Sequence, residues 1–426
     1  TSRASSATYV DSAGLVKTNP YNRVKYSEDF TNRNQITGWS WTNFTITPDA
    51  AVAPDGTQTA DLVVRNTVTT TDGLASHVGW GSTDTIYNAS VYAKANGLSH
   101  ISLIRYVGNT NCQGVSFNLI NGTIHDSQNA TGTIEDVGDG WYRCSIVNDT
   151  NTAANHYFLQ PHDGGTPNHN YRFRVSMAGN NSDGVYIWGA QLTRDVSSTL
   201  YEYVKTTGTG SGGPRYSHDP ETLTPTGLYL EPAATNLITH SNTTDNKFPV
   251  GGSYSTSSET APDGSTTALT FTEDTSNGQH RYYEAVNTPP AGTYTFSIFV
   301  KAANRDHVYL RFDYSGQFKG LTFDLTQEIQ EEQNLPVDFL SASITKYPNG
   351  WYKLSATRTT NGATLYAALE VRTGESGVGQ NFIGNGLPAF HQWGSQVELG
   401  SYPTSYIYTS GSTVTRAADV YTSTAN

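Results

Sequence analysis

Two stretches of the sequence place an arginine four or five residues after a histidine, and both could form a polar face on a strand. An arginine side chain presents paired N–H donors that suit neighbouring hydroxyl groups or a carboxylate. Adjacent strands could add aromatic, acidic and amide side chains to each face. The candidate ligand-binding residues of the first face are Arg105, Tyr106, His156, Tyr157 and Gln160. Those of the second face are Tyr283, Arg311, Asp313, Glu370 and Arg372. The alternative is a solvated sheet face with a structural ion pair between Arg311 and Glu370, because Arg311 and Asp313 are too close in sequence to pair across strands.

Trp80 is a further candidate, because it lies between two glycines and so suits a loop with an exposed ring. Such a ring offers a flat apolar surface to the C–H face of a sugar; simple packing is the alternative. Four other tryptophans occupy equal places in the two halves of the chain, and large duplicated aromatic residues are typical of a core. We therefore expect burial of Trp141, Trp188, Trp351 and Trp393.

No group of residues has the spacing of a known catalytic motif. The chain has no His-Glu-x-x-His pair, no phosphate-binding loop and no strand–turn–helix Gly-x-Ser-x-Gly elbow. A glycosidase needs two carboxyl groups about 5–10 Å apart, but Asp313 and Glu370 have no clear acidic counterparts in the first half. His162, Asp163 and His169 come nearest to a metal cluster, in a Gly/Pro-rich segment typical of a solvated loop. We expect no catalytic residue, no metal ligand and no enzyme activity.

Composition excludes several classes of partner. The chain has 25 Lys and Arg against 37 Asp and Glu, a net charge of −12. It lacks the basic clusters that bind nucleic acid or anionic lipid, and no apolar run approaches the length, about 20 residues, that spans a bilayer. We expect no nucleic-acid partner and no membrane insertion. The polar segment 1–18 does not have the pattern of a signal peptide, and this predicts a cytosolic translation product. The two cysteines, Cys112 and Cys144, are either bridged to each other or free.

Five short motifs occur twice in the same order, offset by about 205–210 residues, which indicates an internal duplication. The copies run from about 24 to 205 and from about 236 to 408. The repeated motifs are Ala-Pro-Asp-Gly at 53–56 and 261–264, Lys-Ala at 94–95 and 301–302, Phe-Asn/Asp-Leu at 117–119 and 323–325, Gly-Trp-Tyr at 140–142 and 350–352, and Trp-Gly-Ala/Ser-Gln at 188–191 and 393–396.

Both copies are predicted to consist of strands. Alternating β-branched and aromatic residues at 293–300 and 307–314 are typical of strands, and Asn-Gly or Asp-Gly turns separate such runs. Only 326–333 has a weakly helical pattern. Many short strands without alternating helices predict an all-β fold with two tandem jelly-roll β-sandwiches. The predicted domains are 19–208 and 209–426.

Several segments resemble a module family common in bacteriophage virion proteins such as tail fibres, tail spikes and head fibres. The resemblance rests on Arg-Ala-Ser-Ser-Ala-Thr-Tyr-Val-Asp at 3–11, Ser-Glu-Asp-Phe-Thr-Asn at 27–32, Pro-Arg-Tyr-Ser-His-Asp-Pro at 214–220, Gly-Leu-Tyr-Leu-Glu-Pro-Ala-Ala-Thr-Asn-Leu at 227–237 and Thr-Arg-Ala-Ala-Asp-Val at 415–420. In that family the first segment runs directly into the Pro-Arg-Tyr segment, whereas a whole sandwich intervenes here. We therefore expect 19–208 to be inserted into the second domain, with 1–18 packed on that domain and a flexible linker at 206–213.

The resemblance implies a jelly roll similar to carbohydrate-binding modules and lectins. It implies a non-enzymatic structural protein of the virion, made in the host cytoplasm and exposed on the particle as a tail fibre, spike, head fibre or capsid decoration. Its expected partners are host-surface or environmental glycans and other virion proteins, and a homotrimer is one oligomeric state that the family implies.

Similar modules hold a structural Ca²⁺ through an acidic residue near the first strand, which Glu28 or Asp29 could supply in the first copy. Apart from that ion we expect no cofactor. Two alternatives to the glycan-binding function remain: a polysaccharide depolymerase, acting as a lyase or glycosidase of a tail spike, and a bacterial surface adhesin.

Overall fold

The structure, a computed structural model, describes residues 3–32, 38–77, 86–106, 112–148, 156–195, 201–208, 210–286, 289–314, 318–331, 335–362, 364–374 and 380–421. Strands dominate these residues, and the only helix among them is a single 3₁₀ turn at Pro348–Gly350. No helix in this described part has the length and apolar character needed to cross a bilayer. The predicted all-β fold class is confirmed.

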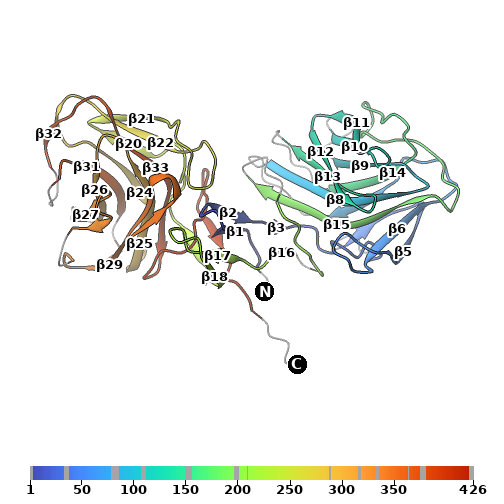
Figure 1. Ribbon diagram of the computed structural model, residues 1–426, viewed down its shortest axis with the longest axis horizontal. Helices are drawn as coiled ribbons and strands as arrows, with labels where there is room; N and C mark the ends of the chain where they lie inside the picture. Colours follow the sequence, from blue (N-terminus) through green and yellow to red (C-terminus); the bar gives the residue numbers. More distant parts are fainter. Residues whose placement is uncertain are drawn as a thin grey trace. The chain divides into compact units, whose positions relative to one another are not determined.

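The chain divides into two compact units. In Figure 1 one unit runs from blue to green, and the other runs from yellow-green to red and also includes the dark-blue segment 6–19. Pro20–Gly213, together with Ser2–Ser5, forms the first sandwich. Ser6–Asn19 and Pro214–Asn426 form the second sandwich, so its two segments flank the first in sequence. The sequence-based domains, 19–208 and 209–426, place the second boundary a few residues earlier than these units do.

The first sandwich consists, within the described ranges, of two six-stranded antiparallel sheets. One, which we call the front sheet, has the order β11 (Thr123–Gln128), β10 (Gln113–Asn118), β9 (His100–Tyr106), β14 (His156–His162), β7 (Leu74–His77), β4 (Trp39–Ser40). The other, the back sheet, has the order β12 (Thr131–Gly138), β13 (Trp141–Asn148), β8 (Ile86–Asn96), β15 (Gly184–Asp195), β6 (Ala60–Arg65), β5 (Phe44–Ala51).

The second sandwich repeats this topology strand for strand in its described residues. Its front sheet has the order β20 (Lys247–Val250), β24 (Arg281–Val286), β31 (Leu365–Arg372), β26 (His307–Tyr314), β27 (Gly320–Asp324), β28 (Ile329–Gln330). Its back sheet has the order β21 (Gly252–Thr256), β22 (Leu269–Glu273), β33 (Pro388–Leu399), β25 (Gly292–Ala302), β30 (Trp351–Thr360), β29 (Phe339–Tyr347). Because consecutive strands repeatedly cross between the sheets, each unit is a jelly roll.

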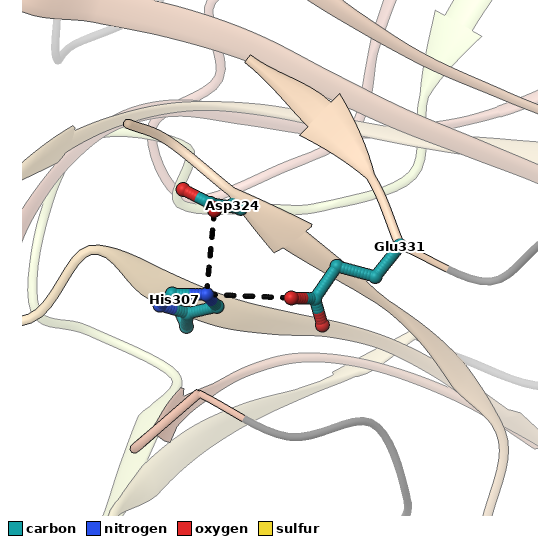
Figure 2. A group of neighbouring side chains, drawn as sticks. All are labelled: His307, Asp324 and Glu331. Carbon is teal, nitrogen blue, oxygen red and sulfur yellow. Dashed lines mark ion pairs between the residues drawn. The ribbon is translucent and has the colours of Figure 1, made fainter. Parts of the chain in front are cut away.

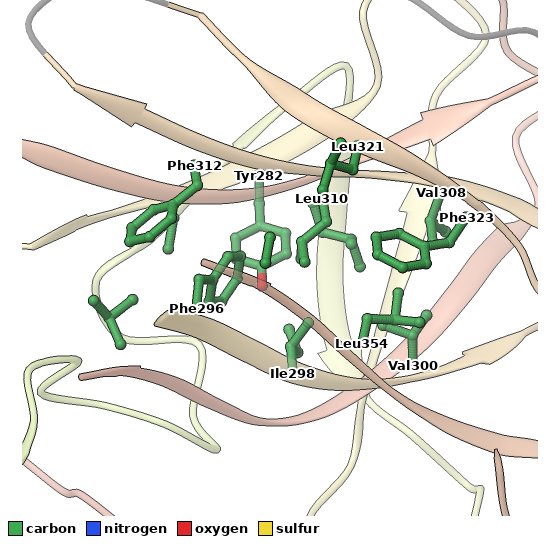
Figure 3. Packing of buried hydrophobic residues seen from close by; sticks show 14 of the residues in the cluster. Tyr282, Phe296, Ile298, Val300, Val308, Leu310, Phe312, Leu321, Phe323 and Leu354 are labelled. Carbon is green, nitrogen blue, oxygen red and sulfur yellow. The ribbon is translucent and has the colours of Figure 1, made fainter. Parts of the chain in front are cut away.

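Alternation along the strands builds the core of the second sandwich (Figure 3). Phe296, Ile298 and Val300 on β25 face Leu310 and Phe312 on β26, and all five are buried. Each such side chain contributes about 1.5–3 kcal/mol by leaving water. The four duplicated tryptophans predicted to be core are buried, as expected: Trp141, Trp188, Trp351 and Trp393.

The repeated Trp-Gly-x-Gln motif marks a β-bulge on the last long strand of each sandwich. The register of β15 shifts after Trp188, and that of β33 shifts near Trp393. The glycines that follow, Gly189 and Gly394, have φ of 62° and 66°, which a residue with a Cβ rarely adopts. The glutamine of the motif then binds the segment that follows the strand. The Val204 N–H donates to Gln191 Oε1 at 2.7 Å, and the Ile407 N–H donates to Gln396 Oε1 at the same distance, 2.7 Å.

Residues 6–19 form a hairpin, β1 (Ala7–Val10) and β2 (Val16–Asn19), that packs on the second sandwich. The Val16 N–H donates to the Pro262 carbonyl at 3.0 Å, and Thr8 Oγ1 donates to the Tyr406 carbonyl at 2.7 Å. Further small pairs connect β3 (Tyr21–Asn22) to β16 (Ser211–Gly212), β17 (Tyr216–His218) to β18 (Pro225–Leu228), β19 (Ala234–Asn236) to β34 (Val414–Arg416) and β23 (Asn277–Gly278) to β32 (Phe382–Ile383).

Two local predictions were wrong. Of the weakly helical range 326–333, the described residues form a turn that leads into β28, because Asp324 Oδ1 accepts the N–H groups of Thr326 and Gln327 and closes a turn. The supposed linker at 206–213 is partly built into the fold: Thr206 is buried and β16 pairs with β3. Cys112 and Cys144, both in the described part, are free thiols.

Candidate functional site

The front face of the second sandwich, meaning the side of its front sheet away from the core, gathers five predicted ligand-binding residues. Val308, Leu310 and Phe312 point into the core, so the alternate residues of β26 lie on the front face. The register places Arg311 and Tyr283 on opposite sides of Ala368 of β31. The five residues that share this face are Tyr283, Arg311, Asp313, Glu370 and Arg372.

Arg311 stands at the centre of an ion-pair network on this face. Its guanidinium donates to Asp313 Oδ2 at 2.7 Å and to Glu370 Oε2 at 3.1 Å. Arg372 pairs with the other oxygen of Glu370 at 3.2 Å and stacks over the Tyr309 ring at 4.1 Å. The structural pair expected between Arg311 and Glu370 is present. Arg311 and Asp313 pair as well, along one strand and not across strands, because residues two apart on a strand share a face.

The side chains of this network are buried, so each charged group in it has lost its contact with water. Burial raises the pKa of Asp313 above its usual range, although Arg311 and the Lys319 N–H favour its ionised form. Buried charges of this kind are tolerated only when each has a partner with good geometry. The network therefore works as a rigid floor rather than as a set of exposed contacts.

Three aromatic rings lie beside this floor and form what we call the aromatic ledge: Phe248 and Tyr366, which are exposed, and Tyr283, which is half-buried. The rings of Phe248 and Tyr283 stack with centroids 5.3 Å apart, and Tyr366 meets Tyr283 edge-on at 6.0 Å. Phe248 is 48% exposed and Tyr366 is 36% exposed. The guanidinium of Arg281, which is half-buried, lies 5.5 Å from the centre of the Tyr283 ring. Together these groups offer an aromatic surface next to N–H donors.

Sequence reasoning missed Phe248. It lies on the short edge strand β20, directly opposite Tyr283 in the register. The available signal is the segment Lys-Phe-Pro-Val, in which a proline marks an edge strand and the aromatic residue precedes it.

The corresponding prediction for the first sandwich was wrong for two residues. Tyr157 is fully buried in the core, where its hydroxyl donates to the Ser90 carbonyl at 2.8 Å. Arg105 lies directly opposite Tyr157 and two residues after Leu103, which belongs to the core. Residues two apart on a strand share a face, so Arg105 points to the inward side of the sheet. Arg105 follows His100 by five residues, whereas Arg311 follows His307 by four, and this difference of one puts the two arginines on opposite faces.

Gln160 does lie on the front face of the first sandwich, but a segment after β14 covers it. Its side chain accepts the Val175 N–H at 2.9 Å and donates to the Val175 carbonyl at 2.9 Å. Phe173 and Val175 of that segment are buried, and Phe173 packs on Ile104 and Phe158 of the front sheet. Gln160 therefore anchors the covering segment. Trp80 and the side chains of Tyr106 and His156 lie outside the described residues.

Lowering the pH should weaken the first sandwich through buried His162, whose Nε2 contacts two serine hydroxyls. Burial, together with the charges of His100, His125 and Arg65, lowers the pKa of His162 to about 3. Because an unfolded histidine titrates near pH ~6.5, the stabilisation by neutral His162 is complete above that pH and is lost as the pH falls toward 3. We expect a loss of about 2 kcal/mol between pH 7 and pH 5.

Chemical denaturation of the wild type and of His162→Gln at both pH values checks this expectation. The stability difference between the two proteins should shrink at pH 5, because only the wild type must exclude the proton. A change at exposed His169 (His169→Gln) serves as the control. A stability difference between wild type and His162→Gln that is equal at both pH values would contradict the assignment.

A second cluster on the front face of the second sandwich could hold a cation (Figure 2). His307 Nε2 lies 3.5 Å from Asp324 Oδ2 and 3.3 Å from Glu331 Oε1. Burial lowers the pKa of His307, but the hydrogen bond to Asp306 and the charges of Asp324, Asp306 and Glu331 outweigh it and raise the pKa above its ordinary value. Without an ion, the neighbouring carboxylates therefore favour the protonated form of the imidazole.

The acidic residues suggested for a calcium ion in the first sandwich have protein partners. Glu28 accepts a hydrogen bond from the Tyr203 hydroxyl at 3.0 Å and pairs with Lys205. Asp29 Oδ1 accepts the N–H groups of Thr31 and Asn32. Lys205 thus supplies the positive charge beside Glu28.

No protein-family model matches the chain, and no curated protein matches it. Among solved structures, the chain is similar to the N-terminal CBM22-1–CBM22-2 tandem domain of Xyn10C from Paenibacillus barcinonensis. The match covers 90% of this chain and 98% of that chain, at 12% sequence identity and a TM-score of 0.29. A likeness this low carries no argument about function, and the fold class rests on the sheets described above.

Proposed function

We propose that the protein is a non-enzymatic glycan-binding protein, and that the aromatic ledge of the second sandwich is its binding surface. The observation that carries this proposal is the juxtaposition of two exposed aromatic rings, Phe248 and Tyr366, and the half-buried ring of Tyr283 with the Arg281 guanidinium on one sheet face. Sugar rings place their C–H faces on aromatic rings, while their hydroxyl groups accept hydrogen bonds from guanidinium groups.

The buried network beside the ledge supports it. Arg311 links β26 to β31 through Glu370, and β31 carries Tyr366. Rings whose supporting strands are fixed lose little entropy when a ligand binds, which favours affinity. The proposal therefore assigns Arg311, Asp313, Glu370 and Arg372 to positioning, and the exposed rings to contact.

The place of action is proposed from the sequence resemblance to phage fibre and spike modules. In that setting the chain lies on the surface of a virion, contacts other virion proteins, assembles as a homotrimer and binds polysaccharide of the host surface. An antiserum against the chain should then label purified particles.

The homotrimer that the resemblance implies belongs to this same proposal, and size-exclusion chromatography with light scattering measures it directly. A trimer agrees with an assembled fibre or spike, and a monomer points instead to a chain that acts singly on the particle.

The second candidate, a polysaccharide depolymerase, is favoured by one observation, the raised pKa of Asp313 beside Glu370. Against it, both carboxylates bind the same guanidinium, which holds them in place as counter-ions. A bacterial surface adhesin would use the same ledge and differs only in where the chain is displayed.

Binding to isolated polysaccharides tests the proposal. We expect the purified chain to sediment with host polysaccharide and to be displaced by free oligosaccharide of the same kind. An unrelated polysaccharide of equal charge serves as the control. Equal binding to both, or to neither, would contradict recognition of a glycan.

A further inference from the structure

We propose that His307, Asp324 and Glu331 form a binding site for a divalent first-row transition-metal ion, with Zn²⁺ as the best match. The three side chains come from β26, from the end of β27 and from the residue after β28, and they converge on one point (Figure 2). One donor atom from each lies within 4.8 Å of the others.

The donor separations suit a tetrahedral ion. Zinc binds imidazole nitrogen and carboxylate oxygen at about 2.0–2.2 Å, so two tetrahedral ligands lie about 3.3–3.5 Å apart. His307 Nε2 is 3.5 Å from Asp324 Oδ2 and 3.3 Å from Glu331 Oε1. The third separation, between the two carboxylate oxygens, lies within 4.8 Å, so the three donors can close around one ion.

The groups around these donors already fix their orientation. His307 Nδ1 bonds to Asp306 Oδ1 at 2.7 Å, which leaves Nε2 as the ligand atom. Asp324 Oδ1 accepts the N–H groups of Thr326 and Gln327 at 2.8 and 3.0 Å, which leaves Oδ2 for an ion. A carboxylate behind a ligating histidine is the usual arrangement in protein metal sites.

The donor set selects the class of ion. Imidazole suits zinc and its neighbours, whereas calcium and magnesium prefer oxygen ligands alone. Three protein ligands leave a fourth position open to water. The first sandwich provides an internal comparison, because His100 lies opposite Asn118 at the register position where His307 faces Asp324. The first sandwich thus lacks this carboxylate.

Metal retention by the full chain tests the proposal. After treatment with a chelator and dialysis against Zn²⁺, we expect a single equivalent of zinc per chain by elemental analysis, and weaker retention of Ca²⁺ and Mg²⁺. Asp324→Asn and Glu331→Gln should each weaken zinc affinity at least about tenfold in calorimetric titration. Glu331 is partly exposed, so its variant should fold even if the Asp324 variant does not.

Asp126→Asn is the matched control, because Asp126 pairs with exposed His169 in the first sandwich. It should leave zinc binding unchanged. Absence of retained zinc in the wild type would overturn the proposal, as would equal loss of zinc in the control and in the folded Glu331→Gln protein.

A different observation carries a second inference: we infer that a pocket beside Trp141 binds an extended polypeptide segment. The pocket, of about 460 Å³, lies between the turn at 53–56 and the turn at 138–139. At the equivalent place in the second sandwich, the turn at 261–264 and Trp351 are covered by β2 of the hairpin, whose Val16 packs with Ala261 and Trp351.

The two places match in backbone geometry. The Gly56 N–H donates to the Ala53 carbonyl at 2.9 Å, and the Gly264 N–H donates to the Ala261 carbonyl at 2.9 Å. In the second sandwich the next carbonyls are used by the hairpin: Pro262 accepts the Val16 N–H and Asp263 accepts Lys17 Nζ, both at 3.0 Å.

The pocket of the first sandwich includes Pro54, which corresponds to Pro262, and its lining carries one positive side chain, Lys94, and one negative side chain, Asp139. Exposed Val52, at 56%, provides an apolar wall. The apolar wall and the matching turn fit an extended segment with an aliphatic residue at the position that Val16 takes in the second sandwich, supplied by another protein. The hairpin of the same chain is already used in the second sandwich.

A synthetic peptide with the sequence of residues 6–19, titrated into the full chain, tests this inference. We expect binding that a Val16→Asp change in the peptide abolishes. Val52→Lys in the protein should weaken binding at least about tenfold by placing a charge in the pocket. Val68→Lys, at an exposed valine elsewhere in the first sandwich, is the control. Absence of peptide binding, or equal binding by the Val52 and Val68 variants, would overturn the inference.

Discussion

Replacing Arg311 with alanine should destabilise the second sandwich by about 3–5 kcal/mol at pH 7. The change removes the guanidinium that binds Asp313 and Glu370, and it leaves both carboxylates buried beside each other. Removing one partner of a buried ion pair costs more than the pair itself contributes, because the remaining charge has no water to replace the lost partner. Chemical denaturation measures the loss.

Two further variants make this result specific. Arg311→Lys keeps the positive charge but cannot reach both carboxylates with the same geometry, so we expect an intermediate loss. Lys346→Ala breaks an exposed pair with Glu328 and should change stability little. A loss for Arg311→Ala no greater than that for Lys346→Ala would show that the network does not support the sheet.

Replacing Phe248 and Tyr283 with alanine should reduce polysaccharide affinity at least about tenfold, which corresponds to about 1.4 kcal/mol. The two rings stack on each other and are the part of the ledge nearest the edge strand β20. Because both rings are at least partly exposed, their loss should leave the core intact. Affinity is measured by calorimetric titration with oligosaccharide.

Tyr216→Ala provides the control for this prediction, since Tyr216 is an exposed tyrosine of the same unit that lies on β17 instead of the front sheet. It should bind as the wild type does. If the double variant also binds as the wild type does, the ledge is not the glycan-binding surface.

The fold was predictable because its signals are local and repeated. Alternation on β25 and β26 reports which side chains face the core, and the duplicated Trp-Gly-x-Gln motif reports a bulge in both copies. The sequence pattern also separates the hairpin of 6–19 from the first sandwich, and the contacts of Val16 and Thr8 lie in the second.

The site was predictable only in part. The sheet face to which a side chain points depends on the strand register, and its exposure depends on which other segments cover that face. A shift of one residue directs Arg105 inward while Arg311 points outward, and approximate alignment of the two copies hides that shift. Nothing in the spacing of Gln160 indicates that Phe173 and Val175 cover the front face of the first sandwich. Phe248 joins Tyr283 only through pairing of strands that are far apart in sequence.

We propose, as set out above, that the second sandwich holds a glycan on its aromatic ledge without cleaving it. The most direct measurement incubates the purified chain with isolated host polysaccharide and follows binding, released reducing ends and the ultraviolet absorbance of unsaturated uronates in one tube. We expect the wild type to bind the polysaccharide without releasing reducing ends or unsaturated uronates, and we expect the variant with Phe248 and Tyr283 replaced to lose binding. Release of either product, or binding that the variant retains, would contradict it.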